Sequence, residues 1–414
     1  MEMHDLVIVG GGPAGMAAAV AAYDAGCTDV VILDREPVLG GILMQCIHNG
    51  FGLHKLGKEL TGPEYAAVYE EKVKERNIKV YYEATVTSVT PERIVTAQCR
   101  DGILKFQAKA VILAMGCRER SRGALNISGS RPAGVYSAGT AQKLVNCMGY
   151  HVGKRVVILG SGDIGLIMAR RMSYEGAKVE AVCEVMPYSG GLTRNIVQCL
   201  EDFGIPLYLS TTVVQIHGTK RLEGVTIARV DANRRVIEET KRYIPCDTLL
   251  LSVGLIPENE LTRAAGIPID PITSGALVDE NCQTQIPGIF ACGNVLQVHD
   301  LVDYVSEEAE RAGIGAASFI RDGEKTAAAI FTKPGYGVRY VLPQTLSATD
   351  KDVSLFLRVM QPYGKVKFTV KSGDKVLAVA KRLKAAPGEM EKILVPAATL
   401  KNAAESITVS LEEI

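Results

Sequence analysis

The sequence predicts an α/β fold with two Rossmann-like, three-layer domains, one inserted into the other, and a C-terminal all-β sandwich-like module. The first observation is a repeated pattern: a short apolar strand, Gly-x-Gly-x-x-Gly, a helix of small residues and then an acidic residue. The second is its spacing, because in both copies the acid lies 24 residues past the first glycine. The third is a change of character over residues 330–414, where short alternating runs separated by turn residues predict a small sandwich.

The first copy follows the apolar run 5–9 and contains Gly10, Gly12 and Gly15, with Asp34 closing the next apolar run. The first glycine permits a tight strand-to-helix turn, the second lets the backbone approach a pyrophosphate, and the third lets helix and strand pack closely. The unpaired N–H groups and the dipole of the helix N-terminus then hold the anion. The acid can accept hydrogen bonds from ribose hydroxyls, so this segment is expected to bind a dinucleotide.

The second copy follows the run 155–159 and contains Gly160, Gly162 and Gly165, with Glu184 closing the next apolar run. A single Gly-x-Gly-x-x-Gly is weak evidence, since many glycine-rich turns are purely structural. Here strand, helix and acid occur twice in the required order, which favours two dinucleotide sites over two incidental turns. A chain with two such sites is expected to pass electrons between two nucleotide cofactors.

The segment between the two copies predicts the rest of the first domain. A glycine-rich loop with polar groups covers residues 39–54, and a polar helix runs from Thr61 to about Arg76 after a cap residue and an early proline. Residues 79–106 alternate as strands of a small antiparallel layer, and the run 110–116 is a buried strand that ends in glycine.

The composition excludes several classes of function. The 414 residues are 47% hydrophobic and 22% charged, which is typical of a soluble globular protein with two or three domains. The 46 basic residues balance the 46 acidic ones, so the chain has no electrostatic footprint for nucleic acid or an anionic membrane. No uncharged apolar run reaches the roughly 18 residues of a membrane-spanning helix. The chain enters its first strand directly, so we expect no signal peptide and a cytoplasmic protein.

The ten cysteines contain no Cys-x-x-Cys, so the usual local motifs for structural zinc, iron–sulfur clusters and thioredoxin-like redox pairs are missing. No metal site is expected. In a reducing compartment most of these thiols should pack as small buried hydrophobic groups. They are Cys27, Cys46, Cys99, Cys117, Cys147, Cys183, Cys199, Cys246, Cys282 and Cys292.

These features resemble the two-dinucleotide-binding-domain flavoproteins, the superfamily of pyridine nucleotide-disulfide oxidoreductases and thioredoxin reductases. In that family the N-terminal fingerprint binds FAD, an inserted Rossmann domain binds NAD(P)H, and the chain returns to complete the FAD domain. A third family marker matches at residues 287–294, although the usual aspartate is here Asn294, which keeps hydrogen-bonding capacity but no charge. The resemblance implies an FAD domain at 1–117 and 256–325, an NAD(H) domain at 118–255 and a C-terminal β domain at 330–414.

The resemblance also implies the cofactor contacts, residue by residue. For FAD they are Gly10, Gly12, Pro13, Ala14, Gly15, Asp34, Arg35, Gly41, Val86, Ala114, Gly116, Gly293, Asn294, Asp300, Leu301 and Val302. For NAD they are Gly160, Gly162, Asp163, Ile164, Gly165, Glu184 and Gly254.

Two further expectations concern the helix beside the flavin and the choice between NADH and NADPH. By resemblance, a helix that starts near residues 299–304 and continues to about Arg321 points its N-terminus at the flavin pyrimidine, where its dipole stabilises negative charge. For the side chains of Asp300 and Asp303 we expect a simple N-cap role on this helix. In the second domain, Glu184 with no arginine pair after it suits a free ribose 2′-hydroxyl and repels a 2′-phosphate, which predicts NADH over NADPH.

The redox cysteines of the family's disulfide reductases are absent from the sequence, both the Cys-x-x-x-x-Cys after the first fingerprint and the Cys-x-x-Cys of the NAD domain. Cys46 alone lies in the loop expected near the isoalloxazine. It is either a packing residue or a peroxidase-like or redox-sensing thiol. His48 and His54 are candidates for a proton relay at the flavin, with ordinary loop hydrogen bonds as the alternative.

A closer resemblance lies in connecting segments at 116–120, 131–135, 137–142 and 188–195. They are similar to small FAD/NAD subunits that accompany a larger glycerol-3-phosphate dehydrogenase-like flavoprotein, and to alpha subunits of dye-linked proline, opine and hydrogen-cyanide-forming amino-acid dehydrogenases. This similarity implies a larger partner subunit that oxidises the organic substrate, and it leaves a homo-oligomer open.

The expected function is therefore that of an FAD-dependent NADH:acceptor oxidoreductase that works inside a complex. The alternatives are an electron-transfer subunit without independent turnover and a Cys46-dependent NADH oxidase or peroxidase. The C-terminal module either docks a partner or another copy, or caps the flavin domain. Its strands are predicted at 338–342, 353–359, 365–370, 376–381, 391–395 and 406–411.

Overall fold

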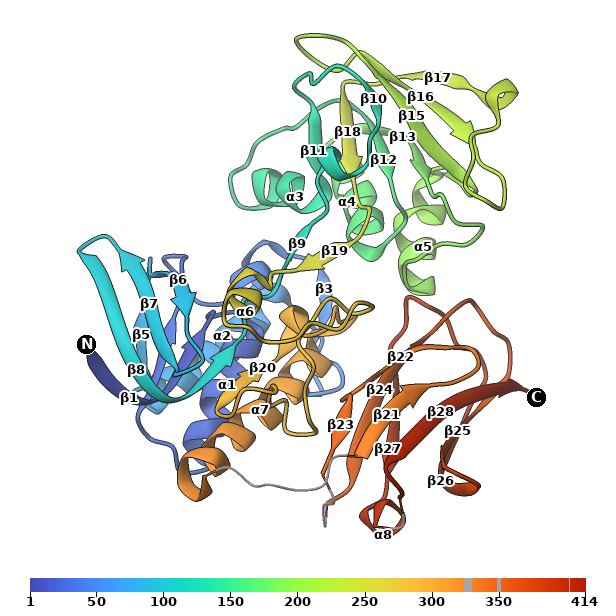
Figure 1. Cartoon of the computed structure of the whole chain (residues 1–414). Helices are drawn as coiled ribbons and strands as arrows, with labels where there is room; N and C mark the ends of the chain where they lie inside the picture. The colour runs from blue at the N-terminus through green and yellow to red at the C-terminus, as the bar shows by residue number, and fades with distance from the viewer. Residues whose placement is uncertain (324–329, 348–350, 402) are drawn as a thin grey trace. The chain divides into compact units, whose positions relative to one another are not determined.

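The computed structural model describes residues 1–323, 330–347, 351–401 and 403–414 (Figure 1). The chain divides into two compact units: residues 118–256 form one, and residues 1–117 with 257–414 form the other. The sequence placed the inserted domain at 118–255. The last two residues of the predicted FAD domain, 324–325, lie outside the described residues.

The first unit contains a sheet with strand order β5-β2-β1-β8-β7-β6, to which β20 adds beside β8. Its parallel strands are β1 (Glu2–Val9), β2 (Val30–Leu33), β5 (Lys79–Tyr81), β20 (Ile289–Ala291) and the end of β8 (Gly102–Leu113). The central strands are continuous runs of buried Val, Ile and Leu, as expected of parallel strands that are buried on both faces.

The antiparallel part of this sheet is shorter than the sequence predicted. Strands β6 (Thr85–Val89) and β7 (Ile94–Cys99) pair antiparallel with each other, and β7 pairs with the first half of β8. Strand β5 was predicted to belong to this layer, and that prediction is wrong. It runs parallel to β2, and its residues Val80 and Tyr81 pack against the main core.

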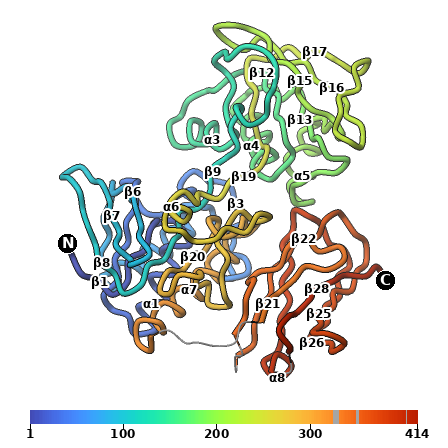
Figure 2. Tube along the Cα trace, in the orientation of Figure 1, coloured from blue at the N-terminus to red at the C-terminus, as the bar shows by residue number. Residues whose placement is uncertain are grey.

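Helices pack on the sheet. Two of them that are far apart in the sequence, α1 (Pro13–Asp24) and α7 (Val302–Asp322), lie side by side (Figures 1 and 2). Small residues allow this approach, since a Cβ on Gly313 would lie 2.3 Å from the Ala18 carbonyl oxygen. Helix α2 (Gly62–Glu75) begins with the predicted cap, a reciprocal capping box between Thr61 and Glu64. A 3₁₀ turn, η1, and the hairpin β3–β4 join β2 to α2; their bounds are Gly41–Gln45, Asn49–Phe51 and Leu60–Thr61.

The second unit contains a parallel five-stranded sheet in the order β11-β18-β12-β13-β14 and a mixed four-stranded sheet in the order β10-β15-β16-β17. In the mixed sheet β10 runs parallel to β15, and the other two pairs are antiparallel. Successive residues of β12 face opposite sides: Ile158 packs in one core with Leu166, and Val157 packs in another with Val225. The strands are β10 (Ser128–Gly129), β11 (Val135–Ser137), β12 (Arg155–Leu159), β13 (Lys178–Cys183), β14 (Leu207–Tyr208), β15 (Thr211–His217), β16 (Gly224–Arg229), β17 (Arg242–Pro245) and β18 (Thr248–Leu251). The helices are α3 (Ala138–Asn146), α4 (Asp163–Tyr174) and α5 (Thr193–Cys199).

The C-terminal segment forms two small sheets, β23-β21-β28-β25-β26 and β22-β24-β27. Their inner faces share a core that includes Leu355, Leu357 and Phe368. Tyr340 and Phe356 instead belong to the core of the first α/β domain, so the module packs directly on that domain. The strands are β21 (Ile330–Pro334), β22 (Val338–Leu342), β23 (Thr345–Leu346), β24 (Val353–Val359), β25 (Val366–Ser372), β26 (Lys375–Arg382), β27 (Glu391–Val395) and β28 (Ser406–Glu413).

The predicted fold class, α/β with Rossmann-like domains and an additional C-terminal β module, is confirmed. Within the part of the chain that the structure describes, no helix combines the length and the apolar character needed to cross a bilayer.

We expect Gly15→Ala to lower the free energy of unfolding by at least about 2 kcal/mol, because the added Cβ would lie 1.8 Å from the Gly10 carbonyl oxygen and backbone cannot move aside cheaply. Urea unfolding measures this loss. Gly364→Ala is the control, since no atom lies within 4 Å of its Cβ position, and it should change stability by less than about 0.5 kcal/mol. Equal, small changes in both variants would contradict the tight packing.

Candidate functional site

The first glycine turn has the geometry that its three glycines were predicted to supply. Gly10 has a φ of 107°, in the left-handed region, and Gly15 packs against the Gly10 carbonyl as described above. Gly12 is the N-cap of α1, and no side chain caps the helix. Gly41 approaches this turn closely, since a Cβ on Gly41 would lie 3.1 Å from the Cα of Gly12. The first N–H groups of α1 have no partner within the helix, so they can serve the oxygens of a pyrophosphate.

The two predicted acids are held in the same way. Asp34 accepts hydrogen bonds from the Gly11 N–H and, at 2.7 Å, from the Glu36 N–H. Glu184 accepts from the Ser161 N–H and the Met186 N–H, both at 2.9 Å. Each acid therefore binds the middle of its own glycine turn and the second residue after itself.

Burial has an electrostatic cost at the first acid. Asp34 is only 6% exposed, and this burial raises the pKa of its carboxyl although hydrogen bonds from Glu36 and Gly11 oppose the shift. Both acids retain lone pairs, because a carboxylate has about four acceptor sites. The remaining sites suit ribose hydroxyls.

Several predicted residues converge at the carboxyl edge of the first sheet. A Cβ on Gly10 would lie 2.4 Å from the Ala114 carbonyl oxygen, and a Cβ on Gly293 would lie 2.7 Å from the Ala14 Cβ. This edge is where open α/β sheets bind ligands. Of the other predicted contacts, Arg35 is largely exposed beside Glu258.

Val86 lies farther from the glycine turn in sequence, in the antiparallel strand β6, and is half-buried. Pro13 opens α1, and Gly116 follows the end of β8 with a φ of 75°. Leu301 and Val302 form the start of α7.

The second glycine turn repeats the first. Gly160 has a φ of 100°, and a Cβ on Gly165 would lie 2.7 Å from the Gly160 carbonyl oxygen and 2.8 Å from the Ser252 Cβ. Ile164 lies in the first turn of α4, and Gly254, with a φ of 99°, follows β18.

One difference between the turns was missed by the sequence analysis. Ser161 stands where the first copy has Gly11, and its hydroxyl donates to Glu184 at 2.7 Å while accepting from the Gly190 N–H. Asp163 accepts from the Leu192 N–H and the Asn195 side-chain amide. These bonds anchor the loop 189–195 to the glycine turn.

A family model described as pyridine nucleotide-disulphide oxidoreductase matches residues 4–312. The chain belongs to this family. Homologues in it are FAD- and NAD(P)H-dependent oxidoreductases, which agrees with the two cofactors expected from the two glycine turns. We call the α/β part of the first unit, for which the sequence predicts FAD binding, the flavin domain, and the second unit, for which it predicts NAD(H) binding, the nicotinamide domain.

Relatives of this flavoprotein differ in their own lengths. One subunit of the opine oxidase of Agrobacterium tumefaciens is 25% identical over 320 residues, which cover 71% of this chain and 61% of that protein. The thioredoxin reductase of Ureaplasma parvum is 26% identical over 297 residues, covering 71% and 89%. The chain thus spans about three fifths of the opine oxidase relative, and it spans 63% of the mitochondrial dihydrolipoyl dehydrogenase of Caenorhabditis elegans.

Solved structures support the same fold. The crystal structure of T. acidophilum thioredoxin reductase has a TM-score of 0.63 and 26% identity, and covers 77% of this chain and 99% of its own. An NAD-dependent persulfide reductase from A. fulgidus covers 96% of this chain and 75% of its own, with a TM-score of 0.59 and 17% identity, which is a likeness of fold alone.

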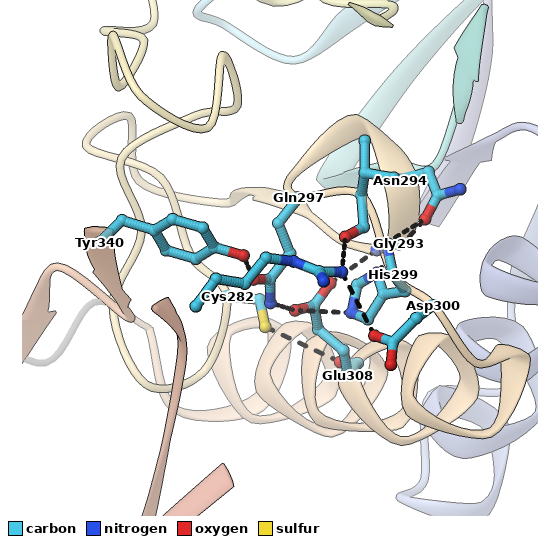
Figure 3. Close-up of polar contacts among 10 residues, drawn as sticks. Cys282, Gly293, Asn294, Gln297, His299, Asp300, Glu308 and Tyr340 are labelled. Carbon is cyan, nitrogen blue, oxygen red and sulfur yellow. Dashed lines mark hydrogen bonds and ion pairs between the residues drawn. The ribbon is translucent and has the colours of Figure 1, made fainter. Parts of the chain in front are cut away.

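The residue at the family's aspartate position, Asn294, takes part in a buried network of the flavin domain (Figure 3). Its side-chain oxygen accepts from the His299 N–H at 3.0 Å, and the His299 ring lies 3.4 Å from the Glu308 carboxylate. Glu308 also accepts from the Gly293 N–H at 2.8 Å and from the Gln297 amide at 2.7 Å. The buried carboxylate of this loop thus comes from α7, and position 294 contributes an amide.

Glu308 is almost fully buried, and this burial alone raises the pKa of its carboxyl. His299 and Arg311, together with the Gln297 hydrogen bond, outweigh that effect and hold the pKa below its ordinary value. A glutamate on the apolar face of this amphipathic helix was the available sequence signal for the buried carboxylate.

The expected N-cap role of Asp300 and Asp303 is wrong. The N-cap of α7 is Leu301, and no side chain caps it. Asp300 turns to the C-terminal module, where it accepts from the Arg358 guanidinium at 3.2 Å and from the Met390 N–H at 3.3 Å. Arg358 also donates to the Val298 carbonyl at 3.0 Å, so the module holds the loop that leads into α7.

The three candidate catalytic side chains lie on one loop but have different surroundings. The Cys46 thiol donates to the Ile42 carbonyl, and the His48 ring stacks on Phe51 at 5.1 Å. His54 reaches α7, since its ring is parallel to that of Tyr304 and its N–H donates to the Asp303 carboxylate at 3.3 Å. The loop therefore meets α7 at His54, and Cys46 and His48 contact their own loop.

Arg358→Met should lower the free energy of unfolding by about 3–5 kcal/mol, because it leaves the buried Asp300 carboxylate without its cation. Urea unfolding of the full chain measures this loss. The double variant Asp300→Asn/Arg358→Met should be more stable than Arg358→Met alone, since it removes the unpaired charge as well. A double variant that is as unstable as the single one, or less stable, would show that the pair is not coupled.

Proposed function

We propose that this chain is an FAD-dependent NADH:acceptor oxidoreductase with the balance NADH + H⁺ + acceptor → NAD⁺ + reduced acceptor. The observation that carries the proposal is the pair of complete glycine turns, each with an acid bonded to it. When bound, FAD supplies a ring that takes a hydride from the nicotinamide and passes two electrons on.

The chain's own residues bind and orient the two nucleotides. The N-terminus of α1 and Asp34 suit the pyrophosphate and ribose of FAD, and the N-terminus of α4 and Glu184 suit those of NADH. The third glycines, Gly15 and Gly165, permit these helix ends to approach the sheet edge.

The acceptor is proposed to come from outside the chain. The ten cysteines all lie in the described residues, and no disulfide bond joins any of them. Burial raises the pKa of Cys27, Cys183 and Cys246 to about 12, which makes these thiols poor nucleophiles. Cys46, which is half-buried, is the thiol for the alternative proposal of an NADH oxidase or peroxidase.

A second proposal is that the chain is the electron-transfer subunit of a complex with a larger dehydrogenase of the glycerol-3-phosphate or amino-acid type. The likeness to an opine oxidase subunit favours it, since that name denotes one part of an assembly. In this case the flavin exchanges electrons with a partner centre, and the chain alone has no turnover with an organic substrate.

Glu184→Arg should reduce the ratio of kcat/KM for NADH to that for NADPH at least about tenfold, because an arginine attracts the 2′-phosphate that a carboxylate repels. Steady-state dye reduction with each nucleotide measures the ratio. Glu175→Arg, at the opposite end of α4, makes the same charge change away from the turn and should leave the ratio within about twofold. An unchanged ratio in Glu184→Arg would refute the assignment of Glu184 to the ribose.

The purified chain, loaded with FAD, tests the function through NADH-dependent reduction of a dye. Turnover by the chain alone supports the first proposal, and flavin reduction by NADH without dye turnover supports the second. Turnover with peroxide or oxygen that disappears in Cys46→Ser supports the thiol alternative. A protein that does not bind FAD, or whose flavin NADH does not reduce, would refute all three.

A further inference from the structure

Asp303, in the first turn of α7, is a buried carboxylate whose hydrogen bonding is incomplete. The residue is 4% exposed, and its Oδ2 atom accepts from the His54 N–H at 3.3 Å. Its buried Oδ1 atom has no hydrogen-bond partner among the described residues. Since native proteins satisfy nearly all buried carboxylate oxygens, a ligand donor is expected at this atom.

The helix itself does not explain the unsatisfied oxygen. A carboxylate in the first turn is favoured by the helix dipole, but the dipole supplies no hydrogen bond to Oδ1, and the cap of α7 uses no side chain. The neighbouring Asp300 provides the contrast, because both of its oxygens are bonded, to Arg358 and Met390.

Two sets of contacts connect Asp303 with the surroundings of the first glycine turn. The loop that begins at Gly41, beside the glycine turn, runs on to His54, and His54 contacts Asp303. The helix that carries Asp303, α7, also packs along α1, and Gly293 packs on Ala14 in the first turn of α1. A dinucleotide with its pyrophosphate at the glycine turn therefore has its second half along this loop, toward the first turn of α7.

The chemistry of the flavin selects the donor. A carboxylate only accepts hydrogen bonds, so its partner must carry an N–H or O–H group. The oxidised isoalloxazine ring has one N–H group, at N3 of its pyrimidine edge. We propose that Asp303 is an FAD-binding residue whose Oδ1 accepts the hydrogen bond from flavin N3–H, an inference that rests on FAD binding at the first glycine turn.

This contact also predicts an effect on the flavin potential. An anionic carboxylate beside the pyrimidine edge opposes the negative charge that reduction adds to the ring. Asp303→Asn keeps the shape and removes the charge, so it should raise the midpoint potential. In equilibrium with a reference dye, the ratio of reduced to oxidised flavin should rise about tenfold, which corresponds to about 30 mV for a two-electron couple.

The direct test compares FAD with 3-methyl-FAD, in which a methyl group replaces the N3 hydrogen. The wild-type chain should bind FAD at least tenfold more tightly than the methyl analogue, measured by the change in flavin fluorescence. In Asp303→Ala this ratio should fall below threefold, because neither ligand then has the acceptor. Asp303→Asn, which retains a neutral acceptor, should give an intermediate ratio.

Glu307→Gln is the matched control, since it removes one negative charge from the next turn of the same helix, where Glu307 pairs with Lys392 near the surface. It should keep the wild-type ratio and potential. Thermal unfolding of the FAD-free variants separates binding from folding: Asp303→Asn should be at least as stable as wild type, because it removes an incompletely bonded buried charge.

An unchanged preference for FAD over 3-methyl-FAD in both Asp303 variants would overturn this inference and point to a ribityl hydroxyl or no ligand donor. Lower stability of the FAD-free variants with an unchanged preference would show a purely structural role and overturn it too. Failure of the wild-type chain to bind FAD would instead refute the proposed function.

Discussion

Both proposed nucleotide sites depend on one interaction, in which an acid at the end of the second strand accepts a hydrogen bond from an N–H group of the glycine turn at the end of the first. Asp34 and Gly11 form it in the flavin domain, and Glu184 and Ser161 form it in the nicotinamide domain. The bond joins two loops at the carboxyl edge of the sheet. It thereby fixes the turn whose N–H groups are proposed to bind the pyrophosphate, and it places the acid at the proposed ribose site.

The second site adds a hydroxyl to this arrangement. Ser161 donates to Glu184 and accepts from the loop that follows, so three hydrogen bonds hold this carboxylate where two hold Asp34. The first site instead gains a neighbour from distant sequence, because Gly41 passes close to Gly12. The same local pattern is therefore completed by different means in the two domains.

Features encoded locally were predictable from the sequence, and features that depend on distant residues were not. The glycine turns, the Thr61 cap and strands such as β22 and β24 follow from short patterns, and the structure has them where they were predicted. The direction of β5 depends on pairing with β2, and the partner of Asp300 lies 58 residues away at Arg358. Periodicity carries no information about either pairing, which is why a cap was the simplest interpretation of Asp300.

We propose that a flavin in this chain takes electrons from NADH and that no second redox group in the chain stores them. Anaerobic titration of the FAD-loaded protein with NADH, followed by the visible flavin absorption, tests this most directly. We predict that one equivalent of NADH per flavin completes the bleaching. No bleaching, or an endpoint near two equivalents as a redox-active cysteine pair would require, would contradict the claim.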